Sequence, residues 1–332
     1  LVYSRQFPPK THSIPLIPFH PSPSGFVFAK RQVQDLELEG YTNEIFYFNT
    51  KISFSVFIQQ FFAFKKLIKS FKPDIIHSHY GTLTGFFASL MHQIPFVITF
   101  QGSDIYRTQD IHPLREKLGK WMSEKSANKA KGIICVSPKM KDLLPTGKEK
   151  AVVIPCGIDI RVFQPLNKIE CKKTLGLSTS KKYIFFNANN PLVKRLDIAQ
   201  TSIQLLQKKY SVELLSLNGN IHPNEIPKYI NACDATLLCS DSEGSPMIIK
   251  ESLACQIPIV SVAVGDVKDR IRGVDNCFIV PQDAEAIKLQ LEVIFENGIN
   301  STNGREKLLK DELDSITTIR RIIQVYKNAI AY

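Results

Sequence analysis

The feature that most constrains the fold is a regular alternation of short apolar runs with longer helical stretches along the chain. The expected strands lie at residues 44–49, 74–79, 96–100, 133–137, 152–155, 183–187, 212–217, 235–239, 258–262 and 277–280. The expected helices lie at residues 25–39, 54–71, 82–92, 113–130, 196–209, 224–232, 247–255, 283–296 and 305–332. Such alternation favours parallel sheets joined by crossover helices. We therefore predict an α/β fold.

The length of 332 residues is enough for two ordinary domains, each with its own core. Pro165 and the polar run at residues 178–182 predict a hinge within residues 160–180. We expect two doubly wound, Rossmann-like sheets that face a central cleft. The predicted parts are a first domain at residues 1–163, a second domain at 164–314, and a last helix at 315–332 that crosses back to the first domain.

The formal net charge is +11, and most of it lies in the first half of the chain. Residues 1–160 contain 20 Lys and Arg against 12 Asp and Glu, whereas residues 161–332 contain 22 against 19. Such a surface suits an anionic membrane, a polyanionic acceptor or nucleic acid. Because no motif interleaves aromatic and basic residues, we do not expect nucleic acid as a partner.

Seven cysteines occur without a Cys-x2-Cys pair, and most lie within apolar runs. This pattern is typical of reduced core residues in a cytosolic protein rather than of a zinc site or a disulfide framework. No apolar run reaches the roughly 18–20 residues that span a bilayer, and no secretory leader is visible. We expect a cytoplasmic protein, although the chain begins at Leu1 and a preceding segment can be missing.

The segment richest in chemistry is Glu243-Gly-Ser-Pro-Met-Ile-Ile-Lys-Glu251. Ser245 suits a helix cap, and Pro246 suits the first helical position. Free N–H groups at a helix start favour anionic or hydroxyl-rich ligands. Glu243 and Glu251 can each accept hydrogen bonds from the vicinal diols of a sugar or a ribose. The alternative is a pair of solvated charges, but a loop between strand and helix is where open α/β sheets bind ligands.

Lys194 and Arg195 are expected at the start of a helix that follows the first strand of the second domain. Two cations beside a helix N-terminus can hold a pyrophosphate and neutralise a departing nucleotide. The alternative is again a pair of solvated surface charges. The position after a strand end favours the phosphate role.

Further motifs accompany these two along most of the chain. They are Asp74-Ile-Ile-His-Ser-His79, Phe100-Gln-Gly-Ser-Asp104, Val136-Ser137, Val153-Ile-Pro-Cys-Gly-Ile-Asp159 with Phe163 and Pro165, and Pro258-Ile-Val-Ser-Val-Ala-Val-Gly265. In order and spacing, the whole set resembles a retaining glycosyltransferase of the GT-B fold, of the large family four. The resemblance implies sugar transfer from a nucleotide-diphosphate donor to a glycan or lipid-linked acceptor, without a cofactor or a required metal. It also implies a hexosyltransferase-like role in cell-surface polysaccharide or glycolipid synthesis, with peripheral association at the inner face of the membrane.

By this resemblance Glu251 accepts hydrogen bonds from the ribose hydroxyls, and Lys194 and Arg195 hold the diphosphate. Glu243 holds the donor sugar and stabilises positive charge at the anomeric centre. The backbone around it completes the donor site, at Gly244, Ser245, Pro246 and Met247.

Two positions depart from the family pattern. Gln101 stands where many relatives carry His, and Asn189 stands where they usually carry Arg. Because Gln hydrogen-bonds but does not titrate, we assign Gln101 to donor-sugar binding rather than acid–base work. The charge of Arg195 can replace that of the missing Arg.

In the first domain, Asp104 either orients the acceptor or caps the following helix. His77 and His79 share a strand face. We predict that His77 is a satisfied buried histidine and that His79 lines the cleft as an acceptor-side residue. No third ligand has the spacing of a metal site.

Three loops have weaker assignments. Gly25 either approaches the donor phosphates or forms a plain helix-entry turn. The loop from Gly219 to His222 lies where relatives place the nucleotide base. Gly265-Asp266 closes another loop, in a binding or a purely structural role.

The helix at residues 54–71 is rich in Phe and carries Lys65, Lys66 and Lys69 near its end. It is either a core helix whose lysines face water or an amphipathic membrane-docking helix. We expect core packing for most of its aromatic residues and membrane contact for a few at the rim.

A second hypothesis is a non-catalytic protein that binds a nucleotide sugar or a glycan. It is motivated by the departures at Gln101 and Asn189. An epimerase or a phosphorylase of the same fold is a further alternative among enzymes.

Overall fold

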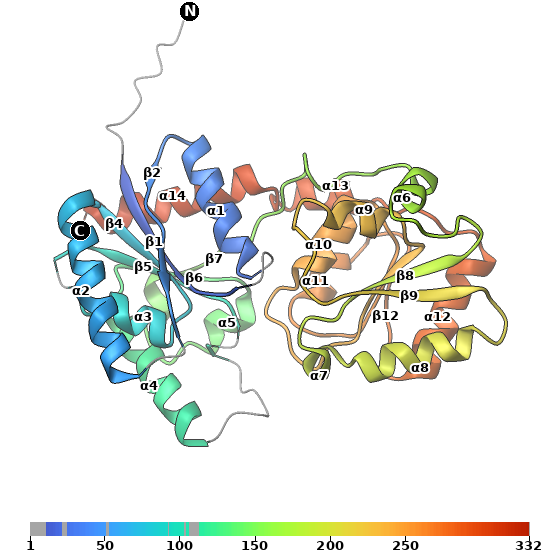
Figure 1. The fold of residues 1–332 in the computed structure, drawn as a ribbon, viewed down its shortest axis with the longest axis horizontal. Helices are drawn as coiled ribbons and strands as arrows, with labels where there is room; N and C mark the ends of the chain where they lie inside the picture. Colours follow the sequence, from blue (N-terminus) through green and yellow to red (C-terminus); the bar gives the residue numbers. More distant parts are fainter. Residues whose placement is uncertain are drawn as a thin grey trace, which may run out of the picture. The chain divides into compact units, whose positions relative to one another are not determined.

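The computed structural model describes residues 11–21, 25–50, 53–91, 93–102, 104–105 and 113–331. These residues form two compact units, coloured along the chain in Figure 1. The first unit contains residues 11–21, 25–155 and 316–331, and the second unit contains residues 156–315. The chain therefore enters the second unit between Pro155 and Cys156.

The first unit is built on a parallel sheet with strand order β2-β1-β4-β5-β6-β7, in which β3 also pairs with β1. Its strands are β1 (His12–Pro18), β2 (Thr42–Asn43), β3 (Phe46–Phe48), β4 (Ile75–His79), β5 (Phe96–Phe100), β6 (Gly132–Cys135) and β7 (Ala151–Val153). Its helices are α1 (Val27–Leu38), α2 (Phe54–Phe71), α3 (Leu83–Ala88), α4 (Pro113–Lys129), α5 (Pro138–Asp142), the 3-10 turn η1 (Lys148–Lys150) and α14 (Ser315–Ala331).

Strand β1 is a central strand that the sequence pattern did not predict. Pro15 and Pro18 lie within it, and proline is usually excluded from central strands because it cannot donate to the ladder. Ile14, Leu16 and Ile17 of the same strand are completely buried. The burial of these side chains, at about 1.5–3 kcal/mol each, outweighs the missing donors.

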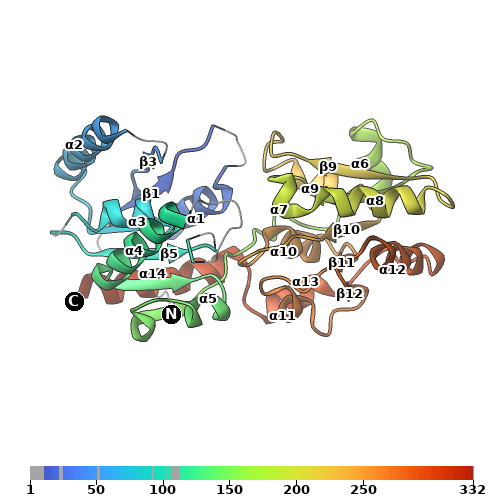
Figure 2. The same cartoon turned by 90° about the horizontal axis from the view of Figure 1, so that it is seen from below.

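The last helix, α14, packs in the core of the first unit. Ile322 and Tyr326 of α14 lie in one apolar cluster with Ile75, Val97 and Ile134 from strands β4, β5 and β6. Figure 1 shows this helix in red among the blue elements of the first unit, and Figure 2 shows the same placement from below. The two ends of the described chain therefore belong to the same unit.

The second unit is a parallel sheet with strand order β12-β11-β10-β8-β9. Its strands are β8 (Lys182–Asn187), β9 (Val212–Leu217), β10 (Ala235–Leu238), β11 (Ile259–Ser261) and β12 (Cys277–Ile279). Its helices are α6 (Lys168–Thr174), α7 (Pro191–Lys194), α8 (Leu196–Leu206), α9 (Ile226–Asn231), α10 (Met247–Ala254), α11 (Val267–Ile271), α12 (Ala284–Glu296) and α13 (Gly304–Lys310). Two parallel sheets with crossover helices confirm the predicted α/β architecture.

The predicted hinge was placed wrongly, because residues 160–180 lie inside the second unit. They contain α6, whose N-terminus is capped by Asn167. The Asn167 side chain accepts hydrogen bonds from the backbone of Ile169 at 3.0 Å and Glu170 at 3.1 Å. Such a cap stabilises a helix by about 1 kcal/mol.

The helices of the structure also test three predictions about helix length and position. The helix expected at residues 82–92 is shorter and ends at Ala88, and His92 lies outside the described residues. The stretch expected to be helical at residues 305–332 is divided into α13 and α14, and the last helix begins at Ser315, as predicted. Across the ranges given above, no helix combines the length and apolar character needed to cross a bilayer.

Candidate functional site

Lys194 and Arg195 follow strand β8, but they do not begin one continuous helix as predicted. The short helix α7 ends at Lys194, and Arg195 adopts a left-handed conformation with φ 57° and ψ 53° before α8 begins at Leu196. The backbone N–H of Asp241 donates to the Val193 carbonyl at 2.9 Å. This hydrogen bond holds the α7 segment against the loop that follows β10.

Lys194 and Glu243 form an ion pair between these two loops. The Lys194 Nζ donates to Glu243 Oε1. Their side chains are only 16% and 14% exposed, so water screens the pair weakly. Two of the residues that the sequence marked as catalytic therefore lie in direct contact, at the carboxyl ends of the neighbouring strands β8 and β10.

Arg195 is held by two carboxylates. Its Nε and Nη2 donate to Asp197 at 3.0 and 2.9 Å, and its Nη1 donates to Asp241 at 3.3 Å. Asp241 also accepts a hydrogen bond from Gln282 at 2.8 Å. Because two carboxylates hold this guanidinium whereas one carboxylate holds the Lys194 ammonium, Lys194 is the better candidate for a phosphate ligand.

The start of α10 differs from the prediction by one residue. Pro246 is the N-cap, with ψ 121°, and the helix begins at Met247. Ser245 does not cap the helix: its hydroxyl donates to Asp266 Oδ2 at 2.8 Å and accepts from Lys250 Nζ at 3.2 Å. The Lys250 ammonium therefore takes the place of a helix N–H group as the donor to this hydroxyl.

The loop after β11 supports the backbone of the Glu243 loop. Gly265 has φ +56°, and a Cβ at this position would lie 2.8 Å from the Gly244 carbonyl oxygen and 3.0 Å from that of Glu243. Only glycine permits such a close approach in this left-handed conformation. Gly265 thus fixes the path of the backbone at Glu243 and Gly244.

Lys250 is a buried cation beneath this loop that the sequence analysis missed. It is 0% exposed, and its Nζ donates to the Cys156 carbonyl at 2.8 Å and to Ser245 Oγ at 3.2 Å. Burial lowers the pKa of Lys250, and the nearby Asp266 carboxylate opposes this effect. Asp266 is itself paired with Arg270 at 3.1 Å. Lys250 therefore joins the start of the second unit to the Glu243 loop.

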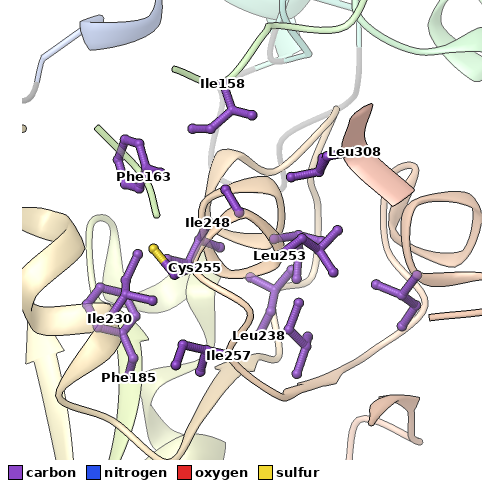
Figure 3. Packing of buried hydrophobic residues seen from close by; sticks show 14 of the residues in the cluster. Ile158, Phe163, Phe185, Ile230, Leu238, Ile248, Leu253, Cys255, Ile257 and Leu308 are labelled. Atoms are coloured by element: carbon purple, nitrogen blue, oxygen red, sulfur yellow. The ribbon is translucent and has the colours of Figure 1, made fainter. Parts of the chain in front are cut away.

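The sequence did contain a signal for this role. Lys250 precedes Leu253 and Ala254 by three and four residues, so it lies on the apolar side of α10. In the core drawn in Figure 3, Leu253 packs with Ile158 and Leu308. A lysine on such a face needs buried partners.

Glu251 lies on the side of α10 that is not covered. Every other residue of this helix except Met247 is buried, and Glu251 follows Met247 by four residues. The two side chains therefore share one half-buried face. This position is compatible with the predicted contact to a ribose.

The burial of Asp104, in the first unit, opposes its predicted role as an acceptor ligand, and residues 106–112, which precede the next helix, lie outside the described residues, so its capping role stays a prediction. It is 5% exposed, and its carboxylate accepts backbone N–H groups of Gly81 at 2.9 Å, Gly102 at 2.8 Å and Gln101 at 3.1 Å. Burial raises the pKa of Asp104, and these hydrogen bonds oppose that effect. Asp104 is thus a structural anion that ties the loops after β4 and β5 together.

His77 is the satisfied buried histidine that the sequence predicted. Its Nδ1 lies 2.6 Å from the Tyr326 hydroxyl, and its Nε2 lies 2.7 Å from Thr99 Oγ1. Burial lowers its pKa well below the usual value.

His79 does not line a cleft, because it is 0% exposed. Its ring stacks on His77 at 4.5 Å, and among the described residues neither of its ring nitrogens has a hydrogen-bond partner. Burial lowers its pKa to about 3. Within the described ranges, no three His, Cys, Asp or Glu side chains are grouped as potential metal ligands.

The remaining candidates lie in loops of both units. Gly25 packs closely on His20, since a Cβ there would lie 2.5 Å from the imidazole. Gln101 is half-buried after β5, and Gly219 has φ +87° after β9. The structure thus groups Lys194, Glu243 and the Ser245 loop within the second unit, whereas Gly25 and Gln101 belong to the first.

Comparison with known protein families identifies the chain. Residues 23–162 match the model described as Glycosyltransferase Family 4, and residues 199–310 match the model described as Glycosyl transferases group 1. The chain belongs to the glycosyltransferases of this family-four type.

Two curated relatives support this assignment. The putative teichuronic acid biosynthesis glycosyltransferase TuaC of Bacillus subtilis is 28% identical over 236 residues, which are 65% of this chain and 59% of that protein. N-acetyl-alpha-D-glucosaminyl L-malate synthase of Bacillus anthracis is 24% identical over 233 residues, which are 62% of this chain and 61% of that protein. The match therefore spans less than two thirds of the length of either relative.

Solved structures show that the fold is GT-B. Sucrose-phosphate synthase from Thermosynechococcus elongatus has a TM-score of 0.78 at 16% identity, covering 96% of this chain and 99% of its own. Anabaena HepE in complex with UDP-glucose has a TM-score of 0.70 at 15% identity, covering 95% and 99%. A UDP-GlcNAc 2-epimerase from Methanocaldococcus jannaschii also matches, with a TM-score of 0.61 at 11% identity over 96% and 99%. Because this fold also supports an epimerase, the activity has to be argued from the site.

Proposed function

We propose that this protein is a retaining glycosyltransferase that moves a sugar from a nucleotide-diphosphate donor to a glycan or lipid-linked acceptor, at the cytoplasmic face of the membrane. The observation that carries the proposal is the weakly exposed ion pair between Lys194 and Glu243 at the carboxyl ends of β8 and β10. A role in cell-surface polysaccharide synthesis is supported by TuaC, whose name refers to teichuronic acid.

Lys194 is the proposed ligand of the donor diphosphate. When a phosphate oxygen approaches, the ammonium group would exchange its bond to Glu243 for a bond to the phosphate. It would then stabilise the negative charge that grows on the leaving nucleotide. A fixed cation can perform this task without a metal, so we propose a metal-independent reaction, which activity retained in excess EDTA would support.

Glu243, released from Lys194, would face the donor sugar. Its carboxylate would stabilise positive charge at the anomeric carbon, and it need not form a covalent bond. Retention would follow from front-face displacement, in which the leaving phosphate takes the acceptor proton. The backbone from Gly244 to Met247, held by Gly265, would bind the sugar hydroxyls.

Glu251 is the proposed ligand of the ribose hydroxyls, and Gln101 and Gly25 are proposed donor contacts from the first unit. His79 and Asp104 are no longer acceptor candidates, because their side chains are buried. Arg195 is a supporting rather than a leading phosphate ligand, since Asp197 and Asp241 hold it.

The alternative is a protein that binds a nucleotide sugar without turning it over. One observation favours it: Arg195 is paired with two carboxylates and therefore does not replace the charge that relatives carry at the position of Asn189. Nucleotide-sugar binding without turnover on any lipid-linked or glycan acceptor would support this alternative. Release of a changed free sugar without an acceptor would instead indicate an epimerase.

The first experiment identifies the donor. UDP-, GDP- and ADP-sugars are compared for their effect on the melting temperature. A ligand at about 100 times its Kd adds about 2.7 kcal/mol to the stability of the folded state. No shift with any of the three classes would count against the proposed site.

The second experiment tests the residues with the donor so found. We expect Lys194→Ala and Glu243→Ala each to lower turnover by about 100-fold or more, because each removes a charge from the reacting centre. Lys181→Ala and Glu213→Ala are matched controls, since they break a more exposed ion pair of the same unit. Full turnover in both site variants would refute the assignment.

A further inference from the structure

Helix α2 exposes a row of large apolar side chains. Phe54 is 82% exposed, Phe62 is 64% exposed and Ile58 is 37% exposed. They are four residues apart, so they form one stripe along the outer face of the helix. Exposed apolar rows of this kind mark interaction surfaces.

The same outer face becomes basic toward the end of α2. Lys65, Lys66 and Lys69 are all exposed, and the Lys65 Nζ lies 4.9 Å from the ring centroid of Phe61. An apolar stripe that is continued by lysines is typical of a helix lying in a membrane interface.

Helix α4 has a second stripe of the same composition. Leu114 is 71% exposed, Leu118 is 52% exposed and Trp121 is 45% exposed. Their spacing of four and three residues places them on one face. Arg115, Lys117 and Lys125 are exposed beside this stripe, whereas Lys120 is paired with Glu116 at 2.8 Å.

Helix α3 joins the two stripes into one layer. Its Phe86 ring lies 5.2 Å from Trp121 of α4, and its Phe87 ring lies 5.5 Å from both Phe57 and Phe64 of α2. The three helices are therefore packed side by side. The exposed side chains of these two stripes, with the basic residues beside them, are called the aromatic–basic face below and comprise Phe54, Ile58, Phe62, Lys65, Lys66, Lys69, Leu114, Arg115, Lys117, Leu118, Trp121 and Lys125.

We propose that the aromatic–basic face docks the first unit on an anionic lipid bilayer. Lipid explains both components of the face, because its acyl boundary accepts Phe, Leu and Trp while its phosphates attract Lys and Arg. A second copy of the chain would bring the same basic residues against themselves, so like charges would oppose self-association. This inference rests on the proposed location at the cytoplasmic face of the membrane and names the surface that makes the contact, but it does not depend on sugar transfer.

The chain supplies its own probe for this docking. Trp121 is the only Trp of the sequence and lies on the proposed face. We expect its fluorescence to shift to the blue with vesicles that mix phosphatidylcholine and phosphatidylglycerol, and to be quenched when the lipids carry brominated chains. Vesicles of phosphatidylcholine alone should bind much more weakly, and salt should weaken the binding to anionic vesicles.

Two variants test the two components by vesicle sedimentation, with Trp121 left in place. Phe54→Ser with Phe62→Ser should lower the partition coefficient by at least about tenfold. Lys65→Glu with Lys69→Glu should lower it by at least about 25-fold, since each lost basic residue weakens binding about fivefold. Both pairs lie outside the proposed donor site, so turnover with a soluble acceptor should not change.

Matched controls lie on the second unit. Leu289→Ser with Val293→Ser removes exposed apolar side chains of α12, and Lys173→Glu with Lys208→Glu reverses two exposed charges. These variants should bind vesicles like the parent protein. Binding lost equally in the controls would overturn the proposal, and so would vesicle binding that leaves the Trp121 emission unchanged. A dimer that Phe54→Ser and Phe62→Ser dissociate, without vesicle binding, would assign the face to a second copy instead.

Discussion

In each unit a buried charged side chain bonds to the loops around the candidate residues, and the charge is negative at Asp104 but positive at Lys250. In the first unit the anion Asp104 accepts backbone N–H groups from the loops after β4 and β5. In the second unit the cation Lys250 donates to the Cys156 carbonyl and to the Ser245 hydroxyl. Backbone groups can therefore compensate a buried charge of either sign: N–H groups stabilise a buried carboxylate, and carbonyl groups stabilise a buried ammonium.

The two regions differ in whether they keep charged side chains available to a ligand. Asp104 is occupied by structural hydrogen bonds on both carboxylate oxygens, so its loop is fixed but offers no charge to a ligand. Lys250 lies beneath the Glu243 loop and leaves Lys194 and Glu243 near the surface. The second unit thus separates the charge that holds the loop from the charges that are available for chemistry.

The largest expected effect is the loss of the acceptor at Asp104. Asp104→Asn would turn an amide NH2 group toward backbone N–H groups that now donate to the carboxylate. At least one of them would lose its partner, which we expect to cost about 3 kcal/mol. Urea unfolding followed by the fluorescence of Trp121 reports the first unit, where this residue lies.

Asp142→Asn is the control, because Asp142 is an exposed carboxylate of the same unit. The Asp142 variant should unfold like the parent protein. Equal midpoints for Asp104→Asn and Asp142→Asn would show that the buried anion does not secure the first unit.

The next effect is a loss of stability of the first unit in acid. Burial lowers the pKa of His79 to about 3 and that of His77 well below its usual value, so both are neutral in the folded state. Below about pH 6.5 the unfolded chain binds protons that the folded unit does not, and stability falls. Between about pH 7.5 and pH 5.5 two such groups cost about 2.7 kcal/mol.

His79→Leu separates the two histidines. In the part of the chain that the structure describes, neither ring nitrogen of His79 has a hydrogen-bond partner, so an apolar side chain breaks no hydrogen bond there. We expect the variant to lose about half of the acid effect, measured by urea unfolding at the two pH values. An unchanged pH dependence would mean that His79 does not titrate on unfolding.

The same comparison explains how far the sequence could predict the structure. The strand and helix alternation, the Glu243 loop after a strand, and the buried His77 follow from local pattern, because each depends on neighbours in the chain. Strand β1 was missed because its two prolines oppose a strand locally while burial of Ile14, Leu16 and Ile17 favours it.

The anchors of the loops were missed for a different physical reason. Lys250 and its partner Cys156 are separated by 94 positions in the chain. Ser245 was assigned to the helix cap because Asp266, its actual partner, lies 21 residues away. The Ser245 hydroxyl donates to Asp266 and accepts from Lys250 rather than from a helix N–H group. Local propensity does not predict this arrangement, since only the folded chain brings Asp266 into reach.

The smallest and most specific effect is expected for Lys250→Met. The side chains are similar in size, and the charge is removed from a buried site, so we expect the stability of the second unit to change by only about 1 kcal/mol. Ser245 would lose one of its two partners, and the affinity for the donor nucleotide identified above should fall about tenfold. Isothermal titration calorimetry with that nucleotide, well below the melting temperature, measures the effect.

Lys172→Met is the matched control, because Lys172 is also buried in the second unit and donates to a backbone carbonyl, that of Lys181 at 2.7 Å. If both variants lose affinity only in proportion to lost stability, Lys250 is a core residue; if Lys250→Met alone loses affinity at unchanged stability, it positions the donor loop.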